Sequence, residues 1–375
     1  MVWDAVVVGG GVAGLVAARG LAATGREVLL LEGSSRVGGK LRTEEVAGLA
    51  VDVGAEAMLA RRPEGIDLVR ELGAEVVHPT TATSGLWSRG ALRDLPRSLM
   101  GVPLDHDQLA ASGVLSPEGL ARAAHETDTD AEPGDDVSVG DLVASRLGDE
   151  IVDRLVEPLL GGVYAGHARH ISAAAAVPQL LAMARRGGLL EQATAVPASV
   201  APVFAAIQGG MGRLPGLLRD GGGFEVRTSA TVRALRRTTS GWALTVGPTT
   251  HPETVEATEV VLATPAAAAA RLLADDVPDA SGELAGIGAA SVAVVSLAFR
   301  AEDLPDALFE RSGFLVPPVE QRTIKASTFS FAKWGWMRDL DPDVVVLRTS
   351  LGRHGEEATL QAADDGLVRV SLADL

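Results

Sequence analysis

The feature that most constrains the fold is a glycine-rich turn near the amino terminus. Residues 9–14 have the sequence Gly-Gly-Gly-Val-Ala-Gly. They follow the β-branched run Ala5–Val8 and precede an alanine- and leucine-rich stretch, 12–23, that is typical of a helix. A second buried strand is predicted over Glu27–Glu32. Strand, turn, helix and strand together form one βαβ unit, so the sequence predicts an α/β fold with parallel strands.

This turn fits the pattern G-x-G-x-x-G of dinucleotide-binding proteins. Gly9 allows a tight turn, Gly11 allows the backbone to approach a pyrophosphate, and Gly14 allows the helix to pack on the strand. The helix begins with Val12 and Ala13, whose N–H groups can face the phosphates. Glu32 ends the second strand and is placed to accept hydrogen bonds from ribose hydroxyls. The alternative is a glycine turn with a purely structural role.

Composition removes several other classes of protein. The 375 residues carry a net charge of −16, which disfavours nucleic-acid binding. The chain has no cysteine, which excludes disulfides, thiolate metal sites and a thiol nucleophile, and fits a reducing cytoplasm. The amino terminus lacks the features of a targeting segment, and the apolar runs are too short for a membrane anchor.

Two further glycine-containing segments identify the class of dinucleotide. Arg36–Thr43 contains the doublet Gly38-Gly39 followed by Lys40, and 48–57 is a short turn that leads into a strand ending near Gly54. A nicotinamide-binding domain has no use for the basic glycine doublet. In this order, the motifs resemble those of the FAD-containing amine oxidase superfamily, whose members carry E-x-x-x-R-x-G-G-[RK] after the second strand.

The resemblance implies a position for each part of the cofactor. Lys40 and the glycine doublet would lie by the phosphates of FAD, and the segment after the turn would run past the isoalloxazine ring. The backbone of Val232 would meet the adenine, although ordinary sheet core is the alternative for this residue. The cofactor-binding residues expected in this way, together with those of the first turn, are Gly9, Gly11, Val12, Ala13, Gly14, Glu32, Gly38, Gly39, Lys40, Gly54, Ala55, Glu56, Ala57 and Val232.

Three later segments resemble the protoporphyrinogen/coproporphyrinogen oxidase family: 146–166, 313–317 and 325–334. Glu56 stands where the eukaryotic enzymes have arginine, which resembles the bacterial branch that acts on coproporphyrinogen III. The resemblance implies an oxygen-using oxidase of heme biosynthesis. In such an enzyme hydride passes from a methylene bridge of the porphyrinogen to flavin, and oxygen reoxidises the flavin to give hydrogen peroxide. No catalytic side chain is identified.

Arg62 is the residue expected to bind substrate carboxylates, because it matches a basic position of the bacterial enzymes. Its neighbour Arg61 has the same chemistry, and a solvated role is the alternative for both. Tyr164, the only tyrosine, either stacks on the substrate or packs structurally. His167 and His170 lack a third ligand nearby in sequence, so no metal is expected.

The predicted organisation has four parts. Residues 1–79 and 209–272 form the FAD-binding domain, 80–208 a helical and substrate lobe, and 273–375 a substrate-domain sheet. Helices are predicted over Pro63–Gly73, Ser138–Leu160, Ala173–Arg186 and from Asp364 onward. The family's C-terminal FAD-binding segment is missing after Leu375, which predicts weak FAD binding.

Two other functions stay open at this point. One is another flavin oxidase or desaturase of the superfamily, acting on amines or carotenoids; an amine oxidase would be expected to have an aromatic cage, and only 3% of residues are aromatic. The other is a truncated, inactive flavin-binding remnant. Contact with the next heme-pathway enzyme and peripheral membrane contact are also left open.

Overall fold

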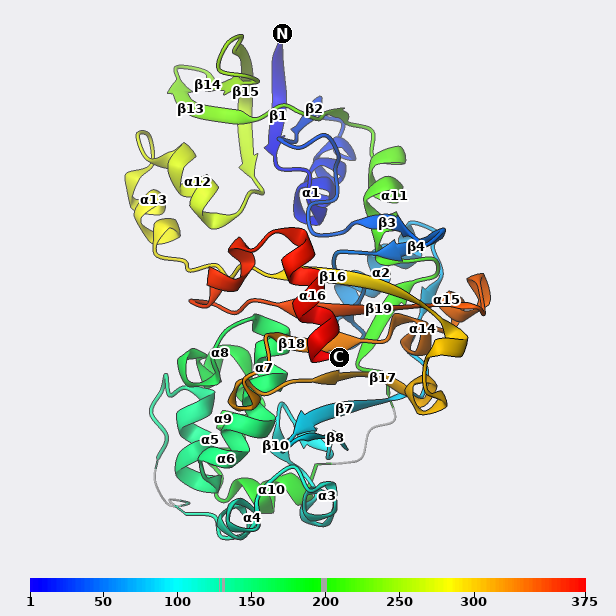
Figure 1. Cartoon of the computed structure of the whole chain (residues 1–375). Helices are drawn as coiled ribbons and strands as arrows, with labels where there is room; N and C mark the ends of the chain where they lie inside the picture. The colour runs from blue at the N-terminus through cyan, green and yellow to red at the C-terminus, as the bar shows by residue number, and fades with distance from the viewer. Residues whose placement is uncertain (128, 130–131, 197–200) are drawn as a thin grey trace. The chain divides into compact units, whose positions relative to one another are not determined.

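The computed structural model describes residues 1–127, 129, 132–196 and 201–375. The chain forms two compact units (Figure 1): Met1–His78 with Pro202–Gly288, and Pro79–Ala201 with Ala289–Leu375. The predicted boundaries after residues 208 and 272 lie elsewhere. The strand Phe204–Ile207 pairs within the first unit, and the helices Ala266–Leu273 and Pro278–Ala285 pack on each other there, so both segments belong to that unit.

A six-stranded sheet organises the first unit, in the order β12-β2-β1-β15-β14-β13. β1 is parallel to β2 and β15, β12 is parallel to β2, and β13, β14 and β15 form an antiparallel meander. The predicted α/β fold is therefore confirmed. The strands are β1 (Val2–Val8), β2 (Val28–Leu31), β12 (Glu225–Arg227), β13 (Val232–Thr238), β14 (Gly241–Val246) and β15 (Glu253–Leu262).

Strand register brings the carboxyl ends of the parallel strands to one edge. Val8 lies opposite both Leu31 and Leu262, and Leu31 lies opposite Arg227. Helix α1 (Val12–Ala22) packs through the buried Leu15 and Ala18. The glycine turn, Glu32 and the end of β15 consequently meet at this edge, where ligands of α/β sheets bind.

Smaller elements complete the first unit. A hairpin, β3 and β4, follows the second glycine segment, and a three-stranded sheet has the order β5-β11-β6. Their bounds are β3 (Thr43–Val46), β4 (Leu49–Asp52), β5 (Met58–Leu59), β6 (Val76–Val77) and β11 (Phe204–Ile207). The remaining helices are α2 (Pro63–Glu71), η3 (Met211–Arg213), α11 (Leu214–Asp220), α12 (Ala266–Leu273) and α13 (Pro278–Ala285).

The second unit is built on another six-stranded sheet, in the order β16-β19-β18-β17-β7-β8. Its pairs are antiparallel except for β17 with β7. The predicted C-terminal helix is confirmed as α16 (Asp364–Asp374), which packs on β16 and β18. The strands are β7 (Thr83–Ser88), β8 (Ala91–Asp94), β16 (Ala293–Arg300), β17 (Arg311–Leu315), β18 (Ile324–Thr328) and β19 (Val344–Leu351). Between them lie η4 (Ala301–Asp303), η5 (Asp306–Glu310), η6 (Pro318–Glu320), α14 (Ser330–Lys333), α15 (Gly335–Leu340) and η7 (Glu357–Gln361).

The helical part of this unit corrects two sequence-based predictions. The helix predicted over Ser138–Leu160 is wrong as one element, because Gly148 adopts a φ of +96° and separates α5 from α6. The helix predicted over Ala173–Arg186 is interrupted at Val177, because Pro178 disfavours a helical residue before it. The elements are the β9 (Ser98–Leu99) and β10 (Val102–Pro103) hairpin, α3 (His106–Ser112), α4 (Pro117–Ala123), α5 (Val139–Leu147), α6 (Asp149–Ile151), the π-helical η1 (Val152–Val156), α7 (Glu157–Tyr164), η2 (Ala168–His170), α8 (Ala173–Ala176), α9 (Pro178–Ala184) and α10 (Leu189–Thr194).

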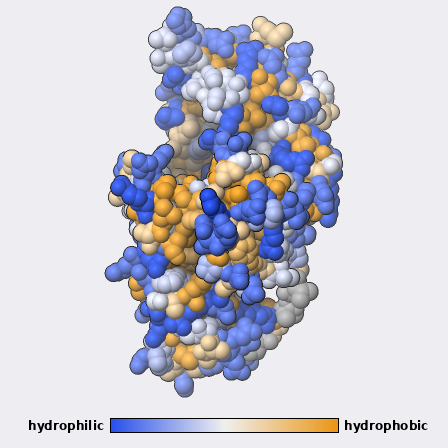
Figure 2. All heavy atoms as spheres, turned by 45° about the vertical axis from the view of Figure 1, so that its right-hand side comes forward, coloured by the Kyte–Doolittle hydropathy of each residue, from blue (hydrophilic) through white to orange (hydrophobic). Residues whose placement is uncertain are grey.

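Charged and polar residues cover most of the face in Figure 2, with hydrophobic residues gathered between them. The acidic run 125–136 forms neither helix nor strand in its described part, and residues 128, 130 and 131 lie outside the described residues. None of the helices in the described part of the chain has the length and apolar character needed to cross a bilayer.

Candidate functional site

The three motif glycines of the first turn have distinct surroundings. Gly9 has a φ of +109°, and a Cβ on it would lie 2.7 Å from the carbonyl oxygen of Ala263. A Cβ on Gly14 would lie 1.9 Å from the carbonyl oxygen of Gly9, so neither position accepts a side chain. A Cβ on Gly11, by contrast, would meet no protein atom within 4 Å. The turn is thus packed at both ends and open at its centre, where a ligand can approach the backbone.

Helix α1 begins at this open position. Its N-cap is Gly11, and no side chain caps the helix. The first helical hydrogen bond runs from the N–H of Leu15 to the carbonyl of Gly11, at 3.0 Å. The N–H groups of Val12 and Ala13 therefore have no acceptor within the helix, and an anion such as a phosphate can take that role.

The Glu32 carboxylate is fixed beside the turn. One oxygen accepts a hydrogen bond from the N–H of Gly10 and the other from the N–H of Ser34, each at 2.7 Å. A carboxylate oxygen has a second lone pair, so both oxygens can still accept from ribose hydroxyls. The expected position of Glu32 at the turn is what the structure shows.

The two later glycine segments join the turn through backbone hydrogen bonds. The N–H of Gly38 donates to the carbonyl of Gly10 at 2.7 Å, and the N–H of Ala55 donates to the carbonyl of Lys40 at 2.9 Å. A Cβ on Gly54 would lie only 2.1 Å from the same Lys40 carbonyl oxygen. Residues 9–14, 38–42 and 53–55 thus form one hydrogen-bonded surface, which we call the cofactor ledge. Glu56 and Ala57 follow directly, and the Lys40 side chain is exposed.

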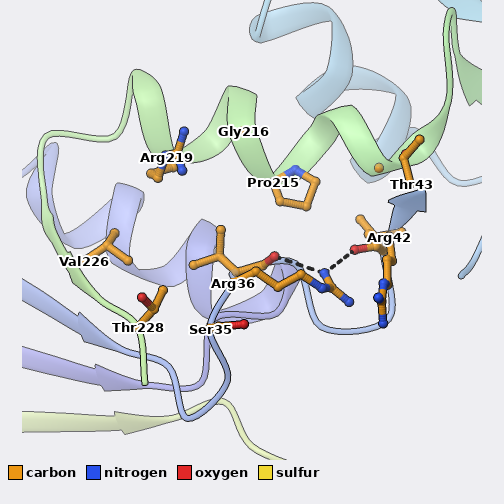
Figure 3. Close-up of a pocket in the computed structure, with 12 residues that line it drawn as sticks. Ser35, Arg36, Arg42, Thr43, Pro215, Gly216, Arg219, Val226 and Thr228 are labelled. Carbon is orange, nitrogen blue, oxygen red and sulfur yellow. Dashed lines mark hydrogen bonds between the residues drawn. The ribbon is translucent and has the colours of Figure 1, made fainter. Parts of the chain in front are cut away.

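Arg36 holds the middle of the ledge in shape. Its guanidinium donates hydrogen bonds to the carbonyls of Val37, Leu41 and Gly39, each at 3.2 Å. In Figure 3 the side chain lies along its own loop, beside a cavity of about 420 Å³ between this loop and helix α11. Arg36 is therefore a positioning residue of the glycine doublet, a role that the motif spacing alone did not indicate.

Asp52 is a second positioning residue that sequence reasoning missed. Its side chain is 6% exposed, and its carboxylate accepts from the N–H groups of Met211 (2.6 Å) and Gly212 (2.9 Å) and from the Thr43 hydroxyl (2.8 Å). It thereby ties the strand that enters the ledge to the start of η3. The available signal was an acidic residue inside the otherwise apolar run 49–53.

Val232 begins β13 and lies near the Glu32 end of the site. The preceding residues pair with the chain after β2: the N–H of Ala230 donates to the carbonyl of Glu32 at 2.8 Å, and that of Ser229 to Ser34 at 2.7 Å. The structure consequently brings together the predicted residues 9–14, 32, 38–40, 54–57 and 232 within the first unit. The open centre at Gly11, the uncapped helix and the fixed carboxylate all fit a dinucleotide cofactor.

The predicted substrate-binding residues belong to different units. Arg62 is the N-cap of α2, and within the described residues neither its side chain nor that of Arg61 has a hydrogen bond or ion pair. They adjoin an apolar strip formed by Leu59, Val203 and Phe204, which are 37%, 61% and 37% exposed. Tyr164 ends α7 in the second unit, where it is half-exposed and its hydroxyl donates to the carbonyl of Ala176 at 3.4 Å.

His167 contacts a carboxylate and a backbone carbonyl. Nδ1 lies 3.2 Å from a carboxylate oxygen of Glu157, and Nε2 lies 3.1 Å from the carbonyl oxygen of His354. The His167 and His170 rings meet edge to face, with centroids 5.8 Å apart. In the portions of the chain that the structure describes, no three His, Asp or Glu side chains are grouped as a metal site.

Comparisons with known proteins agree with this geometry. Residues 12–375 match the family described as flavin containing amine oxidoreductase. The chain is 39% identical to the coproporphyrinogen III oxidase of Mycobacterium tuberculosis strain H37Rv, over 98% of this chain and 81% of the relative. It is 29% identical to the Bacillus subtilis protein of the same name, over 99% and 82%. The crystal structure of a protein assigned as a protoporphyrinogen oxidase from Exiguobacterium superposes with a TM-score of 0.86 and 29% identity, over 99% of this chain and 81% of that one.

Proposed function

The chain belongs to the flavin containing amine oxidoreductase family, and from that premise we propose that it is a porphyrinogen oxidase that prefers coproporphyrinogen III. It is an FAD-dependent oxidoreductase. The proposal is supported by relatives that carry this name and align over nearly the whole chain. We further propose that the reaction belongs to heme biosynthesis.

When bound, FAD would supply the redox chemistry, a two-electron oxidation of the porphyrinogen with oxygen as the final electron acceptor. The chain's own residues would bind the cofactor and orient it. The uncapped start of α1 can bind the pyrophosphate, Glu32 the ribose, and the 53–57 segment the ring system. We assign no catalytic acid or base among the described residues, and we propose that the chain contributes by orienting the substrate against the cofactor.

One observation carries the choice of substrate: the apolar strip Leu59, Val203 and Phe204 borders two arginines that have no side-chain hydrogen bond or ion pair among the described residues. A porphyrinogen is a large apolar ring with carboxylate-bearing side chains, so a surface that joins apolar and cationic groups suits it. Coproporphyrinogen III carries four carboxylates and protoporphyrinogen IX two, and free guanidinium groups favour the former.

The test is aerobic turnover of both porphyrinogens by the FAD-loaded protein, followed by porphyrin fluorescence. Charge-assisted hydrogen bonds are worth about 1.5–3 kcal/mol, so Arg62→Ala should raise KM for coproporphyrinogen III by about ten- to a hundredfold. The kcat should change little, because such a contact binds ground state and transition state alike. Arg271→Ala, which removes an exposed arginine of α12, is the matched control.

An equal or faster rate with protoporphyrinogen IX would refute the preference. An unchanged KM in Arg62→Ala would show that this arginine is solvated and does not bind the substrate. Absence of turnover with either porphyrinogen would refute the proposed function itself. A cytoplasmic location, contact with the next heme-pathway enzyme and peripheral membrane contact stay predictions.

A further inference from the structure

The second unit contains a buried lysine at an irregular point of its sheet. Lys325 is 5% exposed and lies in β18. Ile324 pairs with Leu351 and Ala326 pairs with Ser350. The step from one pair to the next is therefore two residues along β18 but only one residue along β19. Lys325 is the extra residue of this bulge. Bulges redirect side chains and are frequent beside binding sites.

Lys325 has no partner for its charge among the residues that the structure describes: no hydrogen bond or ion pair involves its ammonium group. Burial, together with the neighbouring Arg353 guanidinium, lowers the pKa of Lys325 to about 8. Lys325 Nζ is not among the fully buried polar atoms that lack a partner in the described residues, so this nitrogen reaches solvent although the residue is only 5% exposed. A largely buried ammonium group is normally paired with an acceptor, and here a dissolved anion could take that place.

Arg353 is also 5% exposed and only partly satisfied. One terminal nitrogen donates to the carbonyl of Val316 at 3.3 Å, and the other lies 3.7 Å from a carboxylate oxygen of Glu356. The Arg353 Nε lies 4.0 Å from where a Cβ on Gly161 would stand. Helix α7 therefore presents backbone, with no side chain, beside this arginine.

The net charge of Lys325, Arg353 and Glu356 favours the binding of a single monovalent anion. Lys325 and Arg353 contribute two positive charges and Glu356 one negative charge, which leaves a net charge of about +1 at neutral pH. A carboxylate would balance it, whereas a dianionic phosphate would reverse it. Lysine and arginine together can donate several hydrogen bonds to the two oxygens of a carboxylate.

We propose that Lys325 and Arg353 form a carboxylate-binding site that takes one side-chain carboxylate of the porphyrinogen. The identity of this occupant rests on the proposed function, whereas the site itself rests on the buried cation pair. Neither residue was among the site residues expected from the sequence. Both are positioning and specificity residues in this proposal, with no part in the redox step.

The chain has only three lysines, Lys40, Lys325 and Lys333, which permits a direct test. Trace acetylation of the FAD-loaded protein, read by peptide mass spectrometry over a range of pH, gives the reactivity of each lysine separately. The probes are succinate, inorganic phosphate and coproporphyrin III. Lys40 and Lys333 are internal controls.

We expect succinate and coproporphyrin III to raise the pKa of Lys325. A rise of one unit from about 8 lowers the unprotonated fraction at pH 8, and with it the acetylation rate, by about fivefold. Coproporphyrin III should act at far lower concentration than succinate, and phosphate should have a smaller effect. Unchanged Lys325 reactivity with both carboxylate probes would overturn the site.

The remaining outcomes separate the two proposals. Protection by succinate without protection by coproporphyrin III would overturn the porphyrinogen carboxylate as occupant. Protection by succinate in a protein that turns over no porphyrinogen would refute the proposed function and leave the carboxylate site standing.

Kinetics give a second measurement. Lys325→Met keeps the length of the side chain and removes the buried charge, so the chain should still fold. Its KM for coproporphyrinogen III should rise about tenfold or more while kcat changes less than threefold, and Lys325→Arg should recover most of the loss. Equal KM values for Lys325→Met and the unmodified protein would contradict the proposal.

Discussion

The cofactor ledge of the first unit and the Lys325–Arg353 pair of the second recognise negative groups in opposite ways. The ledge uses backbone N–H groups at a glycine turn and the start of a helix, which carry partial charge and need no desolvated ion. The second site uses two full charges held at 5% exposure. A backbone site is already stable when empty, whereas a buried cation pair is strained until its anion arrives. Substitutions should therefore damage binding and stability to different degrees in the two units.

The largest effect is expected at the centre of the glycine turn. Gly11→Val should abolish FAD binding, because the side chain would occupy the space through which the pyrophosphate reaches the backbone. The protein without FAD should keep its stability, since a Cβ at Gly11 meets no protein atom within 4 Å. A titration with FAD, followed by flavin fluorescence, and the thermal unfolding midpoint measure the two effects separately.

Two other glycines of α1 make this prediction specific. Gly14→Val should lose both FAD and the folded first unit, because its Cβ would lie 1.9 Å from the carbonyl oxygen of Gly9. Gly20→Val is the matched control, since Gly20 is exposed in the same helix and has open space around it. Full FAD retention by Gly11→Val would show that the pyrophosphate does not approach there.

A smaller effect is expected where a side chain supports the ledge. Asp52→Asn replaces one carboxylate oxygen by an amide NH₂, which would face the N–H of Met211 in place of accepting from it. A buried donor left without an acceptor costs about 1–3 kcal/mol, so the urea unfolding midpoint should fall and FAD should bind more weakly. Asp279→Asn, on an exposed residue of α13, serves as control. An unchanged midpoint would mean that the η3 connection does not support the ledge.

The same contrast explains what could be predicted from the sequence. The ledge consists of short sequence segments with glycines at fixed spacing. Residues 9–14, Glu32 and 38–40 could therefore be predicted as part of one site from the sequence alone. Arg36 and Asp52 were missed as supports because most of their hydrogen-bond partners are backbone groups, which carry no residue signature. The Lys325–Arg353 pair depends on a bulge between two strands, and strand register is a long-range property.

Some predicted helix ends and unit boundaries differ from those of the structure for a related reason. The apolar periodicity over 138–160 is real, but Gly148 adopts a φ of +96°, which interrupts the helix. Likewise, the strand Phe204–Ile207 belongs to the first unit because it pairs with β5 and β6, far from it in sequence. Local pattern gives the elements, and tertiary pairing decides their ends and partners.

The smallest expected effect is a pH dependence of stability in the second unit. The pKa of Lys325 is about 8 in the folded protein and near 10.5 when the chain is unfolded. Between these values the unfolded state holds more protons than the folded state, so stability should rise with pH from about 8 to 10.5. Below pH 8 the lysine is charged in both states, and its unfavourable burial is felt in full.

Lys325→Met isolates this contribution from the titration of other groups. Arg353, Glu356 and His167, whose Nε2 lies 3.7 Å from a Glu356 carboxylate oxygen, are present in both proteins. The thermal unfolding midpoint of Lys325→Met should exceed that of the unmodified protein by a few degrees at pH 7, and the difference should shrink toward pH 10. Saturating coproporphyrin III should remove the difference at pH 7, because the bound carboxylate stabilises only the lysine form. A midpoint difference that stays constant from pH 7 to 10 would show that burial of the Lys325 charge does not destabilise the folded protein. The empty second site would then cost no more stability than the empty ledge does.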